Sequence, residues 1–215
     1  MTAFRFALAG VAALALAGTA QAQDFQPKEK GTLMLNTRIT SVAPDQKDPI
    51  VTAAGAATGL NAEVGDDVMP TIGLSYFLTD NVAVEVIAGT TKHDVKAKGG
   101  ATDVLVHQTW VLPPIVSVQY HFNPKGQVSP YVGAGLNYML FYSGKDKNGF
   151  KVDIDNGFGY SLQAGVDVAL KGKWSANVDV KKVFFETDAS INGGALKTKV
   201  KLDPLVASVG VGYKF

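Results

Sequence analysis

The sequence predicts an all-β protein, an eight-stranded antiparallel up-and-down transmembrane β-barrel, and three observations support this prediction. Apolar and polar residues alternate with period two in several segments. Short turns and long polar connections join these segments alternately. The first 22 residues are organised like a secretory signal peptide. The chain is therefore expected to be exported, with residues 23–215 forming one barrel domain.

The composition excludes several other classes of protein. The chain carries 20 Lys and Arg against 19 Asp and Glu, without the basic excess typical of nucleic-acid-binding domains. It has no cysteine, which excludes disulfides, thiol nucleophiles and thiolate metal sites. Only 18% of the residues are charged, and 23 are glycine. These values favour turns and closely packed strands over long surface helices.

The N-terminal segment has one basic residue, Arg5, then an apolar run over residues 6–18 and Ala20-Gln21-Ala22. This order is typical of a signal peptide, and the Ala-x-Ala pattern predicts cleavage after Ala22. The apolar run is too short to span a bilayer, and no later segment has the ~20 apolar residues of a membrane helix. An exported chain of this kind is periplasmic, secreted or an outer-membrane barrel.

The C-terminal segment shows the clearest strand pattern, because alternate residues from Leu205 to Phe215 are apolar or aromatic. Tight turns are expected near residues 79, 125 and 172. Long polar loops are expected at 43–68, 95–108, 143–156 and 187–199. The eight predicted strands lie near 32–42, 71–78, 82–89, 116–122, 132–138, 161–170, 174–181 and 205–215.

The composition of the polar strand face distinguishes a membrane barrel from a soluble barrel or sandwich, which would show the same periodicity. This face is mainly Gly, Ser, Asn and Gln, whereas a water-exposed face is usually rich in Lys and Glu. Small polar residues suit the filled interior of an eight-stranded barrel. The apolar face then meets lipid, with an aromatic girdle near the short turns. Its expected members are Tyr76, Tyr120, Phe122, Trp174, Tyr213 and Phe215.

Six short motifs run in order through most of the chain. They are Thr79-Asp80-Asn81 with Val84-Glu85, Leu112-Pro113-Pro114, Pro130 to Tyr138, Gly165-Val166-Asp167, Leu202-Asp203-Pro204 and Gly212 to Phe215. Together they resemble the outer-membrane protein W (OmpW) family of small barrels. The resemblance implies an eight-stranded outer-membrane barrel with a narrow hydrophobic channel for small apolar molecules. It also implies that the C-terminal aromatic residues, Tyr213 and Phe215, form the signal for the barrel-assembly machinery.

The sequence departs from the family after the alanine of the third strand. The family often has Thr-Pro-Phe there, and that proline is associated with a local gap in the wall. Here Thr90 is followed by Thr91 and Lys92. The position of any gap therefore does not follow from the resemblance.

Strand direction places the inward-facing residues at two depths. The lower half is expected to hold a polar floor, and buried charges must be paired; such a network fills the lumen and also blocks a straight path. The upper half is expected to hold an apolar cup, which is either packing beneath the loops or a binding site for an apolar solute. The floor comprises Glu85, Gln119, His121, Asp167, Asn177, Asp179 and Lys214, with Arg38 and Lys181 somewhat higher. The cup comprises Met69, Met139, Phe141, Val183 and Phe185.

Pro113 and Pro114 lie at the outer part of the fourth strand, where they remove ladder hydrogen bonds. With Gly89 on the facing strand, they are candidates for a lateral gap through which a solute leaves into the membrane. The other interpretation is a strand that simply begins after Pro114.

No enzyme is predicted, and no catalytic, cofactor or metal-binding residues are assigned. Ser117 is four residues from His121 on one strand, too far for direct contact. His93 and His107 flank a long loop, where they are expected to be solvated or to form at most a weak two-ligand metal site. The Asp- and Gly-rich segment 143–156 lacks the spacing of a calcium loop and is expected to be a solvated loop.

The function hypothesis is therefore a Gram-negative outer-membrane channel for passive uptake of small hydrophobic molecules. Its expected partners are outer-membrane lipid, small hydrophobic solutes and the barrel-assembly machinery, without nucleic acid. The alternative is a structural or adhesive barrel with a closed lumen, whose loops carry the function.

Overall fold

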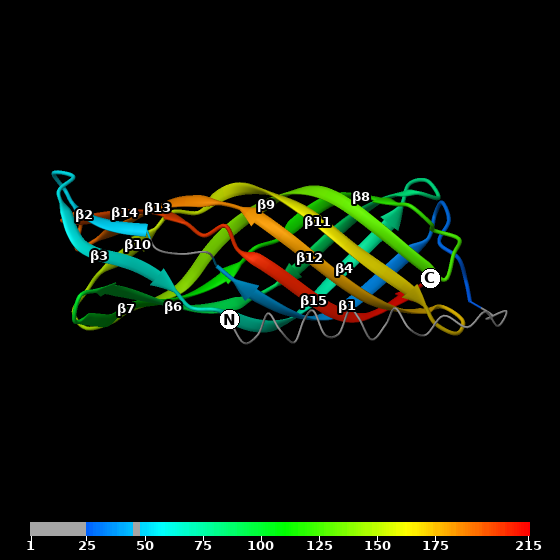
Figure 1. Ribbon diagram of the computed structural model, residues 1–215, viewed down its shortest axis with the longest axis horizontal. Coiled ribbons are helices and arrows are strands. Elements are labelled where there is room, and N and C mark those ends of the chain that lie inside the picture. The colour runs from blue at the N-terminus through cyan, green and yellow to red at the C-terminus, as the bar shows by residue number, and fades with distance from the viewer. Residues whose placement is uncertain (1–24, 45–47) are drawn as a thin grey trace.

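Figure 1 shows a long antiparallel β-barrel whose strands are tilted against its axis. The computed structural model describes residues 25–44 and 48–215, where the regular elements are all β-strands. In these two ranges, no helix has the length and apolar character needed to cross a membrane. The predicted signal peptide, residues 1–22, and its cleavage site lie outside the described residues.

Within residues 25–44 and 48–215, eight strands close into a ring, which confirms the predicted fold class. Each strand pairs antiparallel with the next in chain order, and the last pairs with the first. The strands are β1 (Leu33–Ala43), β4 (Asp67–Phe77), β5 (Val82–Gly89), β8 (Ile115–His121), β9 (Val128–Asp146), β11 (Gly157–Ala169), β12 (Trp174–Phe184) and β15 (Leu205–Lys214).

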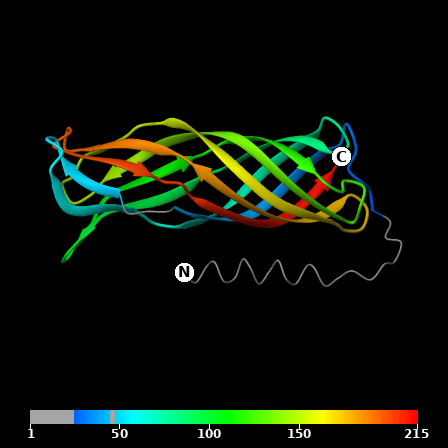
Figure 2. The same cartoon turned by 45° about the horizontal axis from the view of Figure 1, so that its top comes forward.

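The four segments predicted as long polar loops form further strands instead, so this prediction was wrong. The strands extend the barrel at the end opposite the C-terminus, which we call the outer end (Figures 1 and 2). Their buried and exposed residues alternate: in β6, for example, Thr91, His93, Val95 and Ala97 are buried, whereas Lys92 and Asp94 are exposed. They are β2 (Asp48–Thr52), β3 (Ala57–Val64), β6 (Thr91–Gly99), β7 (Thr102–Leu112), β10 (Val152–Ile154), β13 (Glu186–Ile191) and β14 (Leu196–Lys201), paired in the order β10-β13-β14-β2-β3-β6-β7-β9.

The two faces of the barrel strands differ as the alternation predicts. In β8, every second residue from Ile115 to His121 is buried and the residues between are exposed. The expected girdle side chains lie at the end with the short turns, where Trp174, Tyr213 and Phe215 form edge-to-face contacts, as do Tyr120 and Phe122. In the half of the barrel with the short turns, apolar residues thus cover the outside and mainly polar residues face the inside.

Candidate functional site

The lower half of the lumen is filled by buried ion pairs. Arg38 on β1 donates from Nη2 to Glu85 Oε1 at 2.8 Å and from Nε to Asn177 Oδ1 at 2.6 Å. Lys181 Nζ lies 3.3 Å from Glu85 Oε2 and 2.5 Å from Asp179 Oδ1. These five side chains are at most 2% exposed. Mutual pairing offsets the cost of removing their charges from water.

A second part of this network lies nearer the periplasmic end and centres on Lys28, which the sequence analysis missed. Lys28 Nζ lies 2.6 Å from Asp167 Oδ2, 2.9 Å from Ser129 Oγ and 3.1 Å from His121 Nδ1. Asp167 Oδ1 in turn accepts a hydrogen bond from Asn177 at 2.7 Å, which joins the two parts. Lys28 precedes the first strand and belongs to no alternating segment, so no sequence signal placed it inside.

The segment before β1 also packs into the periplasmic end of the barrel. Gln26 N donates to Gly172 O at 2.8 Å, and Phe25 forms an isolated bridge with Gly172 in a short turn. Lys214 of the predicted floor is buried and donates from Nζ to Gln26 O. The polar floor and this segment together leave little free space at the lower end of the lumen.

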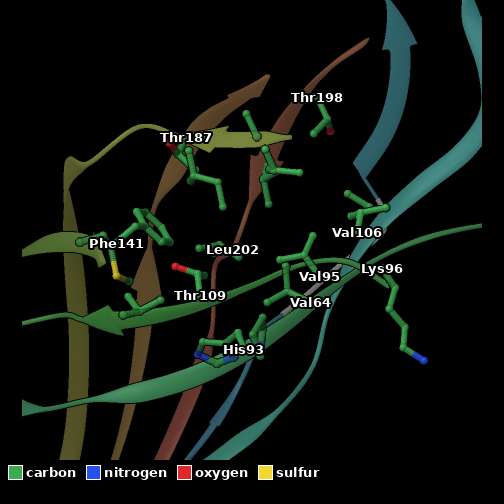
Figure 3. Close-up of a pocket in the computed structure, with 18 of the residues that line it drawn as sticks. Val64, His93, Val95, Lys96, Val106, Thr109, Phe141, Thr187, Thr198 and Leu202 are labelled. Atoms are coloured by element: carbon green, nitrogen blue, oxygen red, sulfur yellow. The ribbon is translucent and has the colours of Figure 1, made fainter. Parts of the chain in front are cut away.

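Above the floor lies an apolar cavity of about 70 Å³. Figure 3 shows residues from several strands around it, including Val64, Val95, Val106 and Leu202. Of the predicted cup residues, Met139 and Phe141 line this upper cavity. Most of its other lining residues come from the outer strands, in segments predicted as loops. Alternating runs such as 91–97 carried the signal that could have identified them.

A smaller cavity of about 50 Å³ lies between the floor and the upper cavity. Met69 and Val183 of the predicted cup line it, and Lys181 of the floor does too. Met139 lines both cavities, so the two are neighbours that share this side chain. Phe185 lines neither; it is buried in the apolar cluster that includes Val183, and its ring packs against Phe141 at 6.1 Å between centroids.

The lower cavity reaches the barrel wall where the backbone ladder is broken. The β5–β8 ladder ends at Ile87–Ile115, and the β6–β7 ladder resumes at Thr91–Val111. Among the described residues, 88–90 and 112–114 form no ladder pairs with each other. We call this the first break. Ala88, Gly89 and Pro113 line the cavity here, and the Ala88 side chain is exposed on the outer surface.

The placement of the two prolines combines both interpretations from the sequence. Strand β8 does begin directly after Pro114, at Ile115, but β7 ends just before Pro113, at Leu112. The prolines therefore lie within the wall, between two strands. Pro114 O accepts a hydrogen bond from Tyr138 N on β9 at 3.2 Å, which attaches this edge to its other neighbour.

A second interruption lies between residues 183–185 and 202–204, and we call it the second break. Here polar groups bridge the two edges. Val183 N donates to Pro204 O at 3.1 Å, and Leu202 N donates to Phe185 O at 3.0 Å. Asp203 has φ of 25° and accepts a hydrogen bond from Phe185 N through Oδ1 at 2.9 Å.

His93 and His107 are buried strand residues, which corrects the expectation that they are solvated in a loop. His93 Nδ1 donates to Gly65 O at 2.7 Å, and its Nε2 lies 2.9 Å from Thr91 Oγ1. His107 Nδ1 lies 2.9 Å from Asp146 Oδ1. The backbone N–H of Val152 and then the His107 side chain lower the pKa of Asp146. Each histidine thus has its own partners, and the described residues contain no group of three or more metal-ligating side chains.

The family model described as the OmpW family matches residues 29–215. This chain belongs to the OmpW family. It is 32% identical to outer membrane protein W of Vibrio cholerae over 87% of this chain and 90% of that protein. It is 28% identical to outer membrane protein AlkL of Ectopseudomonas oleovorans over 75% of this chain and 72% of that protein. As an OmpW-family barrel, it is an outer-membrane protein.

Solved structures agree with this assignment. The crystal structure of the outer membrane protein OprG from Pseudomonas aeruginosa matches with a TM-score of 0.83 and 27% identity, covering 89% of this chain and 99% of OprG. The solid-state NMR structure of AlkL matches in fold with a TM-score of 0.71 and 24% identity, covering 93% of this chain and 97% of AlkL. Phe215 of this OmpW-family chain is exposed and contacts Tyr213; their recognition by the assembly machinery stays a prediction.

Proposed function

We propose that this OmpW-family barrel is a passive channel for small hydrophobic molecules, which enter the apolar cavities from outside and leave sideways through the first break. The observation that carries the proposal is the stacking of two apolar cavities on a polar floor. An apolar solute gains by leaving water for the cavities. It gains nothing from the paired charges below, and it would have to separate them to continue downward.

Lateral exit is supported by the position of the lower cavity. The cavity reaches the wall at Ala88, Gly89 and Pro113, where an apolar solute meets lipid instead of paired charges. Pro113 and Pro114 cannot donate across this part of the wall. Separating its edges therefore breaks fewer backbone hydrogen bonds than separating two continuously paired strands would.

The relatives add support from their names alone. AlkL is an outer-membrane protein, and two relatives, PahQ and DoxH, each 28% identical over 82% of this chain, are described as dibenzothiophene metabolism operon proteins. Dibenzothiophene is an apolar aromatic compound. An operon for its metabolism is a setting in which uptake of an apolar solute would be useful.

The proposal is tested by closing the first break covalently. The absence of native cysteine makes an introduced pair unique, and continuation of the flanking register places Ala88 opposite Pro114. Directly opposed residues of a continuous antiparallel ladder are within disulfide range, so a disulfide here would hold the two edges at ladder spacing. Ala88 is a better position than Gly89, because a Cβ at Gly89 would lie 2.7 Å from Thr71 Cγ2.

The Ala88→Cys/Pro114→Cys variant would be inserted into liposomes whose outer leaflet contains lipopolysaccharide. Uptake of N-phenyl-1-naphthylamine, whose fluorescence rises in hydrocarbon, reports arrival in the membrane. We expect oxidation to reduce uptake to the protein-free rate and reduction to restore it. The control pair Ala164→Cys/Val180→Cys lies in a continuous ladder with both side chains exposed, and its oxidation should leave uptake unchanged.

Two outcomes would count against this function. Equal uptake by the oxidised and reduced variants would contradict lateral exit at the first break. Uptake by the native chain no faster than by protein-free liposomes would contradict the channel function altogether. In that case a structural or adhesive barrel, acting through its outer strands, is the better description.

A further inference from the structure

Thr90 lies at a point of the wall where the backbone is outside the strand ladders. On one side, the β4–β5 ladder ends at Thr71–Gly89, and the same register places Pro70 opposite Thr90. On the other side, the first break places Leu112 opposite Thr90. Among the described residues, Thr90 has no ladder partner in either direction, and it lies between the ends of β5 and β6.

A side chain from β9 supplies a connection instead. The Tyr142 hydroxyl lies 2.5 Å from Thr90 Oγ1, so the two share a hydrogen bond. Tyr142 belongs to β9, which is separated from the Thr90 segment by β7 and the residues that follow it. Both side chains are exposed on the outside of the barrel. The hydrogen bond therefore crosses the upper end of the first break on the outer surface.

The Tyr142 ring is held in position by its own strand pairing. Trp110 and Tyr142 are directly opposite each other in the β7–β9 ladder. Their rings stack with a centroid separation of 6.5 Å and an interplanar angle of 27°. The Tyr142 hydroxyl thus extends from a ring that stacks on Trp110 towards Thr90, which has no ladder partner among the described residues.

We propose that the Tyr142–Thr90 hydrogen bond holds the first break closed and that its opening limits the rate at which a solute leaves the lower cavity. The inference rests on the proposed function and adds a gating residue pair to it. A hydrogen bond between two neutral hydroxyls has a modest net strength, so it breaks and reforms readily. An apolar solute cannot form hydrogen bonds with the two freed hydroxyl groups, so they bond to each other again once the solute has passed.

Two substitutions remove the hydrogen bond with little change in shape. Tyr142→Phe keeps the ring and its stacking on Trp110, and Thr90→Val keeps the size of the side chain. Each should raise the initial rate of N-phenyl-1-naphthylamine uptake about two- to tenfold, the population shift that corresponds to one typical hydrogen bond. The double variant should be no faster than the faster single variant, because both changes remove the same interaction.

Two controls separate gating from general effects on the wall. Tyr160→Phe removes an exposed hydroxyl from β11, where the strand is paired on both sides, and should leave uptake unchanged. Thr90→Ser keeps a hydroxyl at the crossing and should behave like the native chain. Heat-modifiable mobility on gels shows that each variant has assembled, and Thr90→Val carries the test if Tyr142→Phe does not assemble.

The outcomes distinguish this inference from the proposed function. If the native chain takes up dye and neither Tyr142→Phe nor Thr90→Val is faster, the gating pair is wrong while the channel stands. If the two single variants are faster and the double variant multiplies their effects, the residues act independently and the inference is also wrong. If the native chain takes up no dye above the protein-free rate, the channel itself fails.

Discussion

The first and second breaks of the barrel wall both contain proline, yet their edges are connected differently. At the second break, backbone hydrogen bonds flank Pro204, and the Asp203 carboxylate accepts the N–H of Phe185. Lys182 Nζ also donates to Asp203 O. At the first break, a hydrogen bond between the Thr90 and Tyr142 hydroxyls crosses the outer surface. The two breaks therefore differ in the groups that connect their edges: backbone groups and a carboxylate at the second break, and two side-chain hydroxyls at the first.

Residues of the polar floor lie directly below both breaks. Glu85 lies two residues before the ladder end at Ile87, and Lys181 lies two residues before Val183. These two side chains form a buried ion pair. The floor thus connects the strands directly beneath both breaks, so changes in it should affect both, whereas changes at one break should not affect the other.

The largest effect is expected from Glu85→Ala. The change leaves Arg38 without its carboxylate partner and weakens the pairing of Lys181, and uncompensated buried charges cost about 3–5 kcal/mol. Urea unfolding in detergent, followed by gel mobility, measures the loss. Glu63→Ala, which breaks a partly exposed pair with Lys98, is the control and should cost at most about 1 kcal/mol.

A shift for Glu85→Ala no larger than that for Glu63→Ala would show that the floor does not support the wall. If Glu85→Ala fails to assemble, Glu85→Gln keeps acceptor and shape and tests the charge alone. It should still be less stable than the native chain.

An intermediate effect is expected from Asp203→Ala, which should make the second break resemble the first. Phe185 N loses its acceptor, and an unsatisfied buried donor costs about 1–3 kcal/mol. The free energy of unfolding should fall by that amount. Asp203→Asn keeps an acceptor oxygen and tolerates positive φ, so it should stay near the native value. Asp188→Ala, an exposed change on β13, controls for loss of a surface charge. Equal stability of Asp203→Ala and Asp203→Asn would contradict the role assigned to the carboxylate.

The smallest change in stability is expected from Pro113→Thr/Pro114→Thr, which should make the first break resemble a continuous strand. Threonine restores backbone donors and favours strand conformation. We expect a gain of up to about 1 kcal/mol in unfolding free energy together with slower dye uptake. Pro130→Thr in the continuous β9–β11 ladder is the control and should not slow uptake. Faster uptake by the double variant would show that the prolines do not weaken the wall.

The alternation in the sequence was sufficient to predict the ring of eight strands and the alternation of buried and exposed residues along them. Glu85, Asp179 and Lys181 were assigned to the floor, and Met69, Met139 and Val183 to the cup, because period two and strand direction are local properties of the chain. The outer strands were missed because their exposed faces are polar enough to look like loops. The period continues through them, as Thr91 to Ala97 shows.

The partners of these residues were decided only by the tertiary structure. Lys28 and Asp167 are 139 positions apart in the chain, and Thr90 and Tyr142 are 52 apart. A strand pattern specifies which way a side chain points, but contact between distant side chains depends on the register of every strand between them and on closure of the ring. For this protein, the sequence by itself predicted a polar lower lumen and an apolar upper lumen, and it left open whether Pro113 and Pro114 lie within the wall. Closure of the barrel decided which charges pair in the floor and which break is bridged by a carboxylate, because both depend on atoms from strands that meet only in the folded ring.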